Sequence, residues 1–222
     1  MDHKMISLAD QVFNEIERKI LSGYYKRGEL LTESRLSEEL GVSRTPIREA
    51  FFRLNQEHLL EISPKGALVL GTTRQDIRDI YEIRLRIEGL ASRLAAENIT
   101  DEGIAELRRD LELQEFFTGK GDSDGIKDMD DRFHLTIYSN CASPILRYTL
   151  EPLHRRIVKY RKASISAKSR AADSLKEHQQ IFEAISAHRP DEAEALTITH
   201  VRNAMNHILA SAEGPDEAPA DR

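Results

Sequence analysis

Hydrophobic residues recur with helical spacing over most of this chain, and extended patterns are confined to a short region near residue 60. Residues 7–22 predict a first helix, whose apolar positions fall on one face. From residue 74 onward the same period continues, and polar, glycine or proline breaks divide the region into six helices. These breaks fall at residues 98–100, 118–123, 140–144, 167–170 and 189–190. The pattern therefore predicts a mainly α protein.

Two short helices joined by a tight turn are predicted between residues 32 and 56. Thr32 can cap the first helix, and Gly41 can end it because glycine accepts the left-handed backbone that often follows a helix. Ser43 is placed to cap the second helix, with its side chain on a free backbone N–H. The apolar residues of this second helix are Ile47, Ala50, Phe51 and Leu54. Their spacing gives the helix one buried face and one exposed face.

A small β-hairpin is predicted directly after these helices. The runs Leu59–Ile62 and Ala67–Leu70 flank a turn of sequence Ser-Pro-Lys-Gly, which carries Lys65 at its tip. Two helices followed by a hairpin are the element order of a winged helix-turn-helix domain. We therefore expect a DNA-binding domain with a cationic wing.

Donor side chains occupy the exposed face of the second helix. Arg44, Thr45 and Arg48 lie near its N-terminus, where a recognition helix presents donors to bases and phosphates. The alternative is that the arginines of this region are ordinary solvated side chains. We favour that alternative for Arg53, near the end of the same helix, but not for the others. The adjoining turn and hairpin favour DNA contacts for Arg44 and Arg48.

The run GVSRTPIREAFFRL resembles the recognition-helix signature of the GntR family of bacterial transcription regulators. The resemblance implies that the arginines and Thr45 touch DNA and that the wing glycine allows approach to the minor groove. Arg27 and His58 depart from the family pattern, which usually has Pro and Gly there. The expected DNA-binding residues are Arg35, Ser43, Arg44, Thr45, Arg48, Lys65 and Gly66.

Charge and length set further bounds. The formal net charge is −6, so non-specific electrostatic attraction to DNA should be modest and the cationic groups act locally. The 222 residues suffice for two modest domains, which we place at 1–73 and 74–212, followed by a disordered tail at 213–222. No apolar run approaches membrane-spanning length, no signal peptide is evident and Cys141 is the only cysteine. These features favour a cytoplasmic protein.

Polar residues interrupt the apolar stripes of the helical region. Asp130 and His134 lie one turn apart within such a stripe, and His178 and His200 lie inward on two later helices. Burying such groups unpaired is costly, and side chains at i and i+4 can reach one metal ion. Taken singly, each is more simply explained as a hydrogen-bonded core residue.

A second resemblance adds weight to the metal interpretation. The segment DDRFHLTIYSN is similar to the D-x-x-F-H stretch of the FCD subgroup of GntR regulators, whose effector domain is all helical. KEHQQIFEAI and THVRNAM resemble the later stretches that supply histidines in that subgroup. The resemblance implies a divalent metal site of Asp130, His134, His178 and His200. We expect zinc, with nickel, iron or manganese as alternatives. Six helices suggest the VanR-like branch.

Arg84 is a further charged residue in an apolar stripe, and YEIRLRIEGLASRLAA resembles the opening of the same effector domain. A planar guanidinium suits a ligand carboxylate, so we expect Arg84 to bind the effector. The alternative is an internal ion pair with Glu88, one helical turn later.

The combined interpretation is a homodimeric transcription regulator, a repressor, that binds pseudo-palindromic double-stranded operator DNA and responds to a small organic acid. A metal-dependent hydrolase or lyase is one alternative, although nothing in the sequence supplies an accompanying nucleophile arrangement. A dedicated metal sensor is the other. We expect no enzymatic activity and no membrane association.

Overall fold

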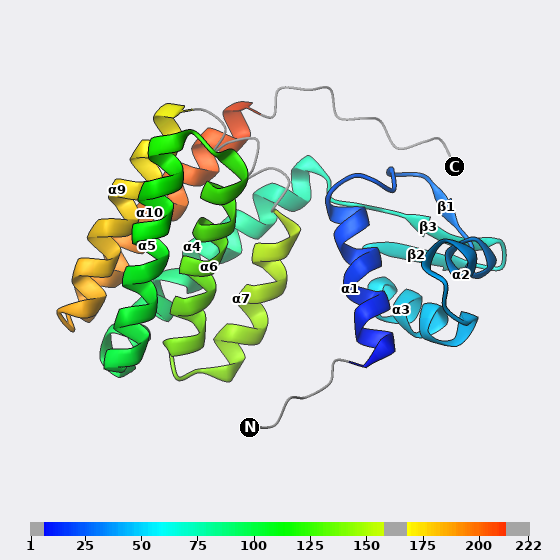
Figure 1. The fold of residues 1–222 in the computed structure, drawn as a ribbon, viewed down its shortest axis with the longest axis horizontal. Helices are drawn as coiled ribbons and strands as arrows, with labels where there is room; N and C mark the ends of the chain where they lie inside the picture. The colour runs from blue at the N-terminus through cyan, green and yellow to red at the C-terminus, as the bar shows by residue number, and fades with distance from the viewer. Residues whose placement is uncertain (1–6, 158–167, 212–222) are drawn as a thin grey trace. The chain divides into compact units, whose positions relative to one another are not determined.

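The computed structural model describes residues 7–157 and 168–211, which form two compact units divided between Thr73 and Arg74 (Figure 1). The expected combination of a winged helix-turn-helix domain and an all-helical domain is confirmed. The expected tail at residues 213–222 lies outside the described residues. None of the described helices is long and apolar enough to cross a membrane.

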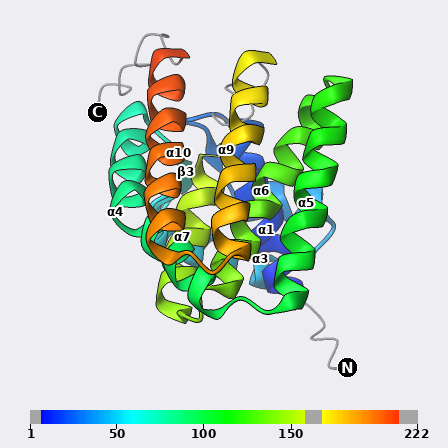
Figure 2. The same ribbon diagram turned by 90° about the vertical axis from the view of Figure 1, so that its left-hand side faces the viewer.

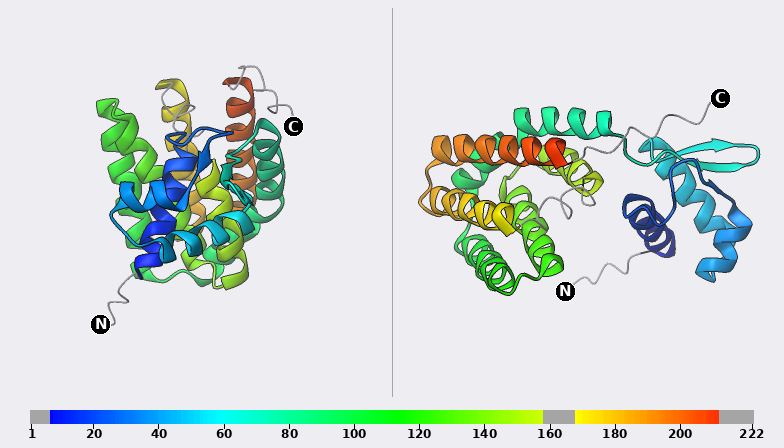
Figure 3. Two further views of the ribbon diagram at one scale, coloured as in Figure 1. Left: turned by 90° about the vertical axis from the view of Figure 1, so that its right-hand side faces the viewer. Right: turned by 90° about the horizontal axis from the view of Figure 1, so that it is seen from above.

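Over residues 7–73 the first unit contains three helices and a three-stranded sheet; Figure 3 shows their arrangement. The helices are α1 (Leu8–Leu21), α2 (Glu33–Leu40) and α3 (Arg44–Gln56). Thr32 caps α2 by accepting from Arg35 N at 3.3 Å, and Gly41 ends it at φ 66°. Both features agree with the sequence prediction. Ser43 stands at the N-cap of α3, but its side chain makes no capping hydrogen bond, so that part of the prediction was wrong.

The sheet is antiparallel, in the order β1-β3-β2. Strands β2 (Leu60–Ser63) and β3 (Gly66–Val69) form the expected hairpin, displaced by one residue from the predicted runs. Strand β1 (Leu30–Leu31) was not predicted, because two residues carry no readable alternation. It pairs with β3, so that Leu31 lies opposite Ala67.

Two residues, one at the hairpin and one after helix α3, have a positive backbone φ. Gly66 has a φ of 140°, and a Cβ atom there would lie 2.5 Å from the carbonyl oxygen of Leu31, so only glycine fits. His58 follows α3 with a φ of 56°, in the left-handed region. Glycine would adopt this φ without the strain that a side chain brings.

The second unit is built from helices alone within the described residues. Over residues 74–157 and 168–211 these number six, the number that the sequence predicted. The fourth was expected to continue to about residue 167; α7 ends at Arg156, and residues 158–167 are outside the described part of the chain. The six are α4 (Arg74–Asn98), α5 (Asp101–Lys120), α6 (Ser123–Asn140), α7 (Pro144–Arg156), α9 (Lys168–Ser186) and α10 (Pro190–Ser211).

The packing of these helices determines where the buried polar residues of the bundle meet. Helix α10 lies along α4, and α9 lies between α10 and α5 (Figure 2). Helix α6 packs against both α4 and α5. The main apolar core is therefore shared by several helices, and includes Ala95, Leu107, Phe133, Ile137, Leu150, Ile181 and Ile185. Polar residues from α4, α6, α9 and α10 meet beside this core, where they are shielded from water.

Candidate DNA-binding surface and metal centre

Helix α3 has the two faces that the sequence predicted. Pro46, Ile47 and Ala50 are buried, whereas the proposed DNA-contacting residues of this helix are on the opposite, exposed face. The exposed residues are Arg44, Thr45 and Arg48. Because the apolar face holds α3 against the rest of the unit, the donors are presented from a fixed support.

Two of the expected DNA-contacting arginines form ion pairs with acidic neighbours. Arg48 donates from Nε and Nη2 to the two carboxylate oxygens of Glu33, at 2.8 and 2.7 Å. Arg35 Nη1 lies 2.7 Å from Glu29 Oε1. The hydrogen bonds from Arg48 lower the pKa of Glu33, which therefore stays ionised beside the recognition helix.

Of the remaining members, Ser43 and Lys65 are exposed, whereas Gly66 is half-buried at the start of β3. Ser43 precedes α3, and Lys65 stands at the exposed tip of the hairpin, where its backbone N–H donates to Ser63 Oγ at 3.3 Å. A Cβ atom at Gly66 would lie 2.5 Å from the Leu31 carbonyl oxygen, so glycine has a packing reason here that is independent of DNA. Ser43 and Lys65 are therefore exposed at the turn before α3 and at the tip of the wing, with Gly66 directly after Lys65.

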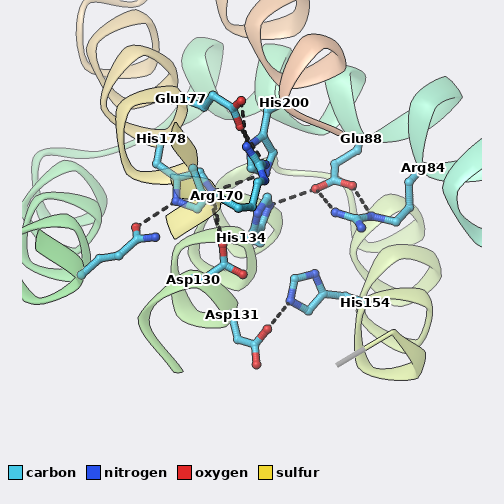
Figure 4. A network of polar contacts seen from close by, with 12 residues as sticks. Arg84, Glu88, Asp130, Asp131, His134, His154, Arg170, Glu177, His178 and His200 are labelled. Atoms are coloured by element: carbon cyan, nitrogen blue, oxygen red, sulfur yellow. Dashed lines mark hydrogen bonds and ion pairs between the residues drawn. The ribbon is translucent and has the colours of Figure 1, made fainter. Parts of the chain in front are cut away.

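Three histidines from three helices converge in the core of the second unit (Figure 4). His134 comes from α6, His178 from α9 and His200 from α10, and each is at most 1% exposed. One ring nitrogen from each lies within 4.8 Å of the others. The Nε2 atoms of His178 and His200 are 3.4 Å apart.

Each of these histidines is anchored at its other ring nitrogen by an oxygen atom. His134 Nδ1 lies 2.9 Å from Glu88 Oε1, and His200 Nδ1 lies 2.7 Å from Glu177 Oε2. His178 Nδ1 lies 2.9 Å from Gln114 Oε1. Ionised carboxylates only accept, so the Nδ1 atoms of His134 and His200 donate to them, and in the neutral form of each ring Nε2 keeps its lone pair.

This arrangement presents three buried imidazoles, each supported by an oxygen atom at its second nitrogen. Lone pairs on converging Nε2 atoms repel one another unless a cation or a proton lies between them. Metal-binding histidines ordinarily donate their second N–H to a carboxylate or carbonyl, which fixes the tautomer and the ring orientation. The donor set around His134, His178 and His200 therefore fits a divalent transition metal.

Asp130 lies beside the histidine cluster. Its side chain is buried, and Oδ1 lies 3.5 Å from His178 Nε2 and 3.5 Å from Ser174 Oγ. The structure thus brings all four sequence-predicted residues to one place. The closest grouping is formed by the three histidines, with Asp130 adjacent to it.

Arg84 forms the ion pair that the sequence left as an alternative. Its Nε and Nη2 donate to Glu88 at 2.6 and 3.0 Å, and both side chains are 1% exposed. Glu88 Oε1 also accepts from Tyr138 at 2.8 Å, as well as facing His134. Burial raises the pKa of the Glu88 carboxyl, but Arg84 and His134 hold it well below its usual range.

Sequence reasoning missed most of the residues that surround the histidines. Gln114 and Glu177 were not singled out, and Glu177 also receives two hydrogen bonds from Arg170, at 3.0 and 2.9 Å. Although burial raises the pKa of Glu177, hydrogen bonds from His200 and Arg170 lower it to about 2. His154 was also outside the predicted set; it is buried, with its ring centroid 5.3 Å from that of His134. Its Nε2 lies 2.9 Å from Asp131 Oδ1.

Comparison with known families agrees with this two-part organisation. The profile described as "Bacterial regulatory proteins, gntR family" matches residues 8–70. The profile of the FCD domain matches residues 79–203, which is more than half of the chain. The two matched segments correspond to the winged helix-turn-helix unit and to the helical unit that holds the histidines.

Individual relatives are similar over most of their length. The Escherichia coli regulator McbR is 35% identical over 69% of this chain and 70% of its own. An uncharacterised HTH-type regulator of Bacillus subtilis, YdhC, is 29% identical over 89% of both chains. The solved structure of E. coli McbR/YncC superposes with a TM-score of 0.78 at 28% identity, covering 92% of this chain and 98% of that one. The chain therefore belongs to the GntR family of bacterial regulatory proteins, with an FCD effector domain, and is a transcription regulator rather than an enzyme.

Proposed function

We propose that this regulator is a metal-dependent, effector-responsive repressor that acts as a homodimer in the cytoplasm. A divalent transition metal is held by Asp130, His134, His178 and His200, and a small organic acid is the signal. One observation carries the proposal: three buried histidines bring one ring nitrogen each within 4.8 Å of the others, while an oxygen atom lies close to each Nδ1. A core that only needed apolar packing would not require this arrangement.

The ligand chemistry sets the class of metal. Nitrogen from imidazole and oxygen from a carboxylate suit zinc, nickel, iron or manganese, and zinc is our first choice because it binds both kinds of ligand and can expand beyond four-coordination, which leaves a position after the four protein ligands are bound. The Asp130 and histidine side chains would supply the protein ligands. The open coordination position would accept an oxygen of the effector carboxylate.

Arg84 can offer an anionic effector fewer hydrogen bonds than a guanidinium with all its donors free. Glu88 already occupies its Nε and Nη2 atoms. Its Nη1 atom is buried with no hydrogen-bond partner within the described residues. A buried donor of this kind is costly unless a ligand satisfies it. We therefore propose that Arg84 contacts the effector carboxylate through Nη1 while it remains paired with Glu88.

Dimerisation follows from how recognition helices read DNA. One helix covers one half-site, so two copies related by a twofold axis would bind a pseudo-palindromic operator in successive major grooves. Large exposed apolar side chains on α7, Ile145 at 78% and Tyr148 at 71%, support an interface between copies. Repression is supported by relatives named as repressors, including the gluconate operon repressor of Bacillus licheniformis and RspR of E. coli.

Metal content and thermal stability test the central part of this proposal. The purified chain should contain about one divalent metal ion, and chelation should lower its melting temperature because bound metal stabilises only the folded state. His200→Ala should abolish both properties. His207→Ala, on the same helix, is the matched control and should keep them. Metal-free wild-type protein whose melting temperature is unchanged by added zinc, nickel, iron or manganese would overturn the proposal.

A further inference from the structure

The ion pair between Arg48 and Glu33 joins the two helices of the helix-turn-helix. Glu33 is the first residue of α2, and Arg48 lies in the second turn of α3. Both carboxylate oxygens are used, at 2.8 and 2.7 Å. The Arg48 side chain is nevertheless 70% exposed, whereas that of Glu33 is 30% exposed. The pair therefore fixes a guanidinium that is still open to a ligand.

The geometry of the pair determines which donors of Arg48 stay available. A guanidinium has five N–H donors in a rigid plane, and Glu33 takes Nε–H and one N–H of Nη2. The remaining donors are on Nη1 and on the outer side of Nη2. These form the end-on edge of the guanidinium, which offers two parallel N–H groups. Guanine O6 and N7 in the major groove accept such a bidentate edge.

A contribution to folding stability does not explain why Arg48 and Glu33 are paired. Exposed ion pairs contribute little to the free energy of folding, because both side chains lose conformational freedom when they pair. That same loss becomes useful for recognition, since an arginine already held in place has less freedom to lose when it meets a base. An anionic group beside DNA also repels phosphates, so Glu33 disfavours binding that relies on the backbone alone.

We propose that Glu33 is a positioning residue for base readout, which holds Arg48 so that its outer edge reads a guanine in the operator. This goes beyond the metal and effector roles proposed above and does not depend on them. Arg48 is the group that touches DNA, and Glu33 acts through it. The pair thus converts a cationic side chain, able to bind any phosphate, into a reader of one base.

The test is selection of binding sites from a random DNA pool by the full-length chain, followed by affinity measurements on the selected site. Replacing the guanine that Arg48 reads should lower wild-type affinity about 5- to 150-fold. Glu33→Gln should reduce this discrimination about 2- to 10-fold and raise affinity for unrelated duplex DNA. Arg48→Lys keeps the charge without the fork, and should lose the guanine preference while keeping phosphate binding.

Two controls separate positioning from general effects on charge or folding. Glu15→Gln removes another bidentate exposed pair, with Arg18 on α1, at 3.0 and 2.6 Å, and should leave discrimination unchanged. In an Arg48→Lys background, Glu33→Gln should cause no further loss of discrimination, because the residue it positions is gone. Undiminished guanine preference in Glu33→Gln or in Arg48→Lys would overturn the proposal. So would an equal loss from Glu33→Gln in the presence and absence of Arg48.

Discussion

Replacing Arg84 by methionine should strongly destabilise the helical domain. The substitution keeps most of the apolar length of the side chain but removes the bidentate pair with Glu88, both partners of which are 1% exposed. Glu88 would retain Tyr138 and His134 as partners, but would lose its only arginine contact within the described residues. Breaking a buried pair by removing one partner costs about 3–5 kcal/mol, because the other charge is left uncompensated.

That free energy translates into a measurable change in melting temperature. For a chain of this size, each kcal/mol shifts the melting temperature by about 2–4 °C, so Arg84→Met should lower it by roughly 6–20 °C. Differential scanning calorimetry on metal-free protein, with the transition of the helical domain assigned by near-UV circular dichroism, measures the effect. Metal-free conditions keep any change in metal affinity out of the comparison.

Two further variants make this prediction specific. Arg86→Met removes an exposed arginine of the same helix, whose contact with Glu82 is 3.7 Å, and should cost less than about 1 kcal/mol. Adding Glu88→Gln to Arg84→Met should restore part of the lost stability, because the stranded charge is removed. If Arg84→Met proves as stable as Arg86→Met, the buried pair does not carry the stability assigned to it, and Arg84 serves the effector alone.

Other predictions follow from the DNA-binding unit. His58→Gly should raise the stability of this unit by about 1 kcal/mol, since glycine adopts the left-handed φ of 56° without the strain of a side chain; urea denaturation measures this. Gly66→Ala should lower stability by about 1–3 kcal/mol in the same assay, because its Cβ would lie 2.5 Å from the Leu31 carbonyl oxygen; an unchanged midpoint would refute this packing argument. Arg44→Ala should weaken operator binding by about 1–3 kcal/mol without altering metal content, and full affinity in gel-shift titrations would remove Arg44 from the DNA-contacting set.

Local regularities made most of the fold predictable. Helices were readable because apolar positions repeat within one element, and the turns at Thr32 and Gly41 carry their own capping chemistry. Strand β1 was missed because two residues contain no period; only its pairing with β3 makes it a strand. The inward positions of His134, His178 and His200 could also be read from their own helices, since each interrupts an apolar stripe.

The parts of the site that the sequence did not reveal depend on contacts between segments that are distant in the sequence. The pair of Arg84 with Glu88 was foreseeable because the residues lie one turn apart on one helix. The anchoring of His178 by Gln114 joins α9 to α5 across 64 positions, and no local pattern signals it. His154 likewise reaches the site only because α7 packs against α6. The outer shell of a buried site is a property of tertiary packing rather than of sequence spacing.

The most direct test of the account is operator affinity measured against a panel of small organic acids, with metal bound and with metal removed. In metal-loaded wild-type protein, at least one acid should weaken operator binding, and the response should disappear after chelation or in His200→Ala. His207→Ala should respond like wild type. Operator affinity that is indifferent to every acid in the presence of metal, or a response that survives both chelation and His200→Ala, would contradict a metal-organised effector site.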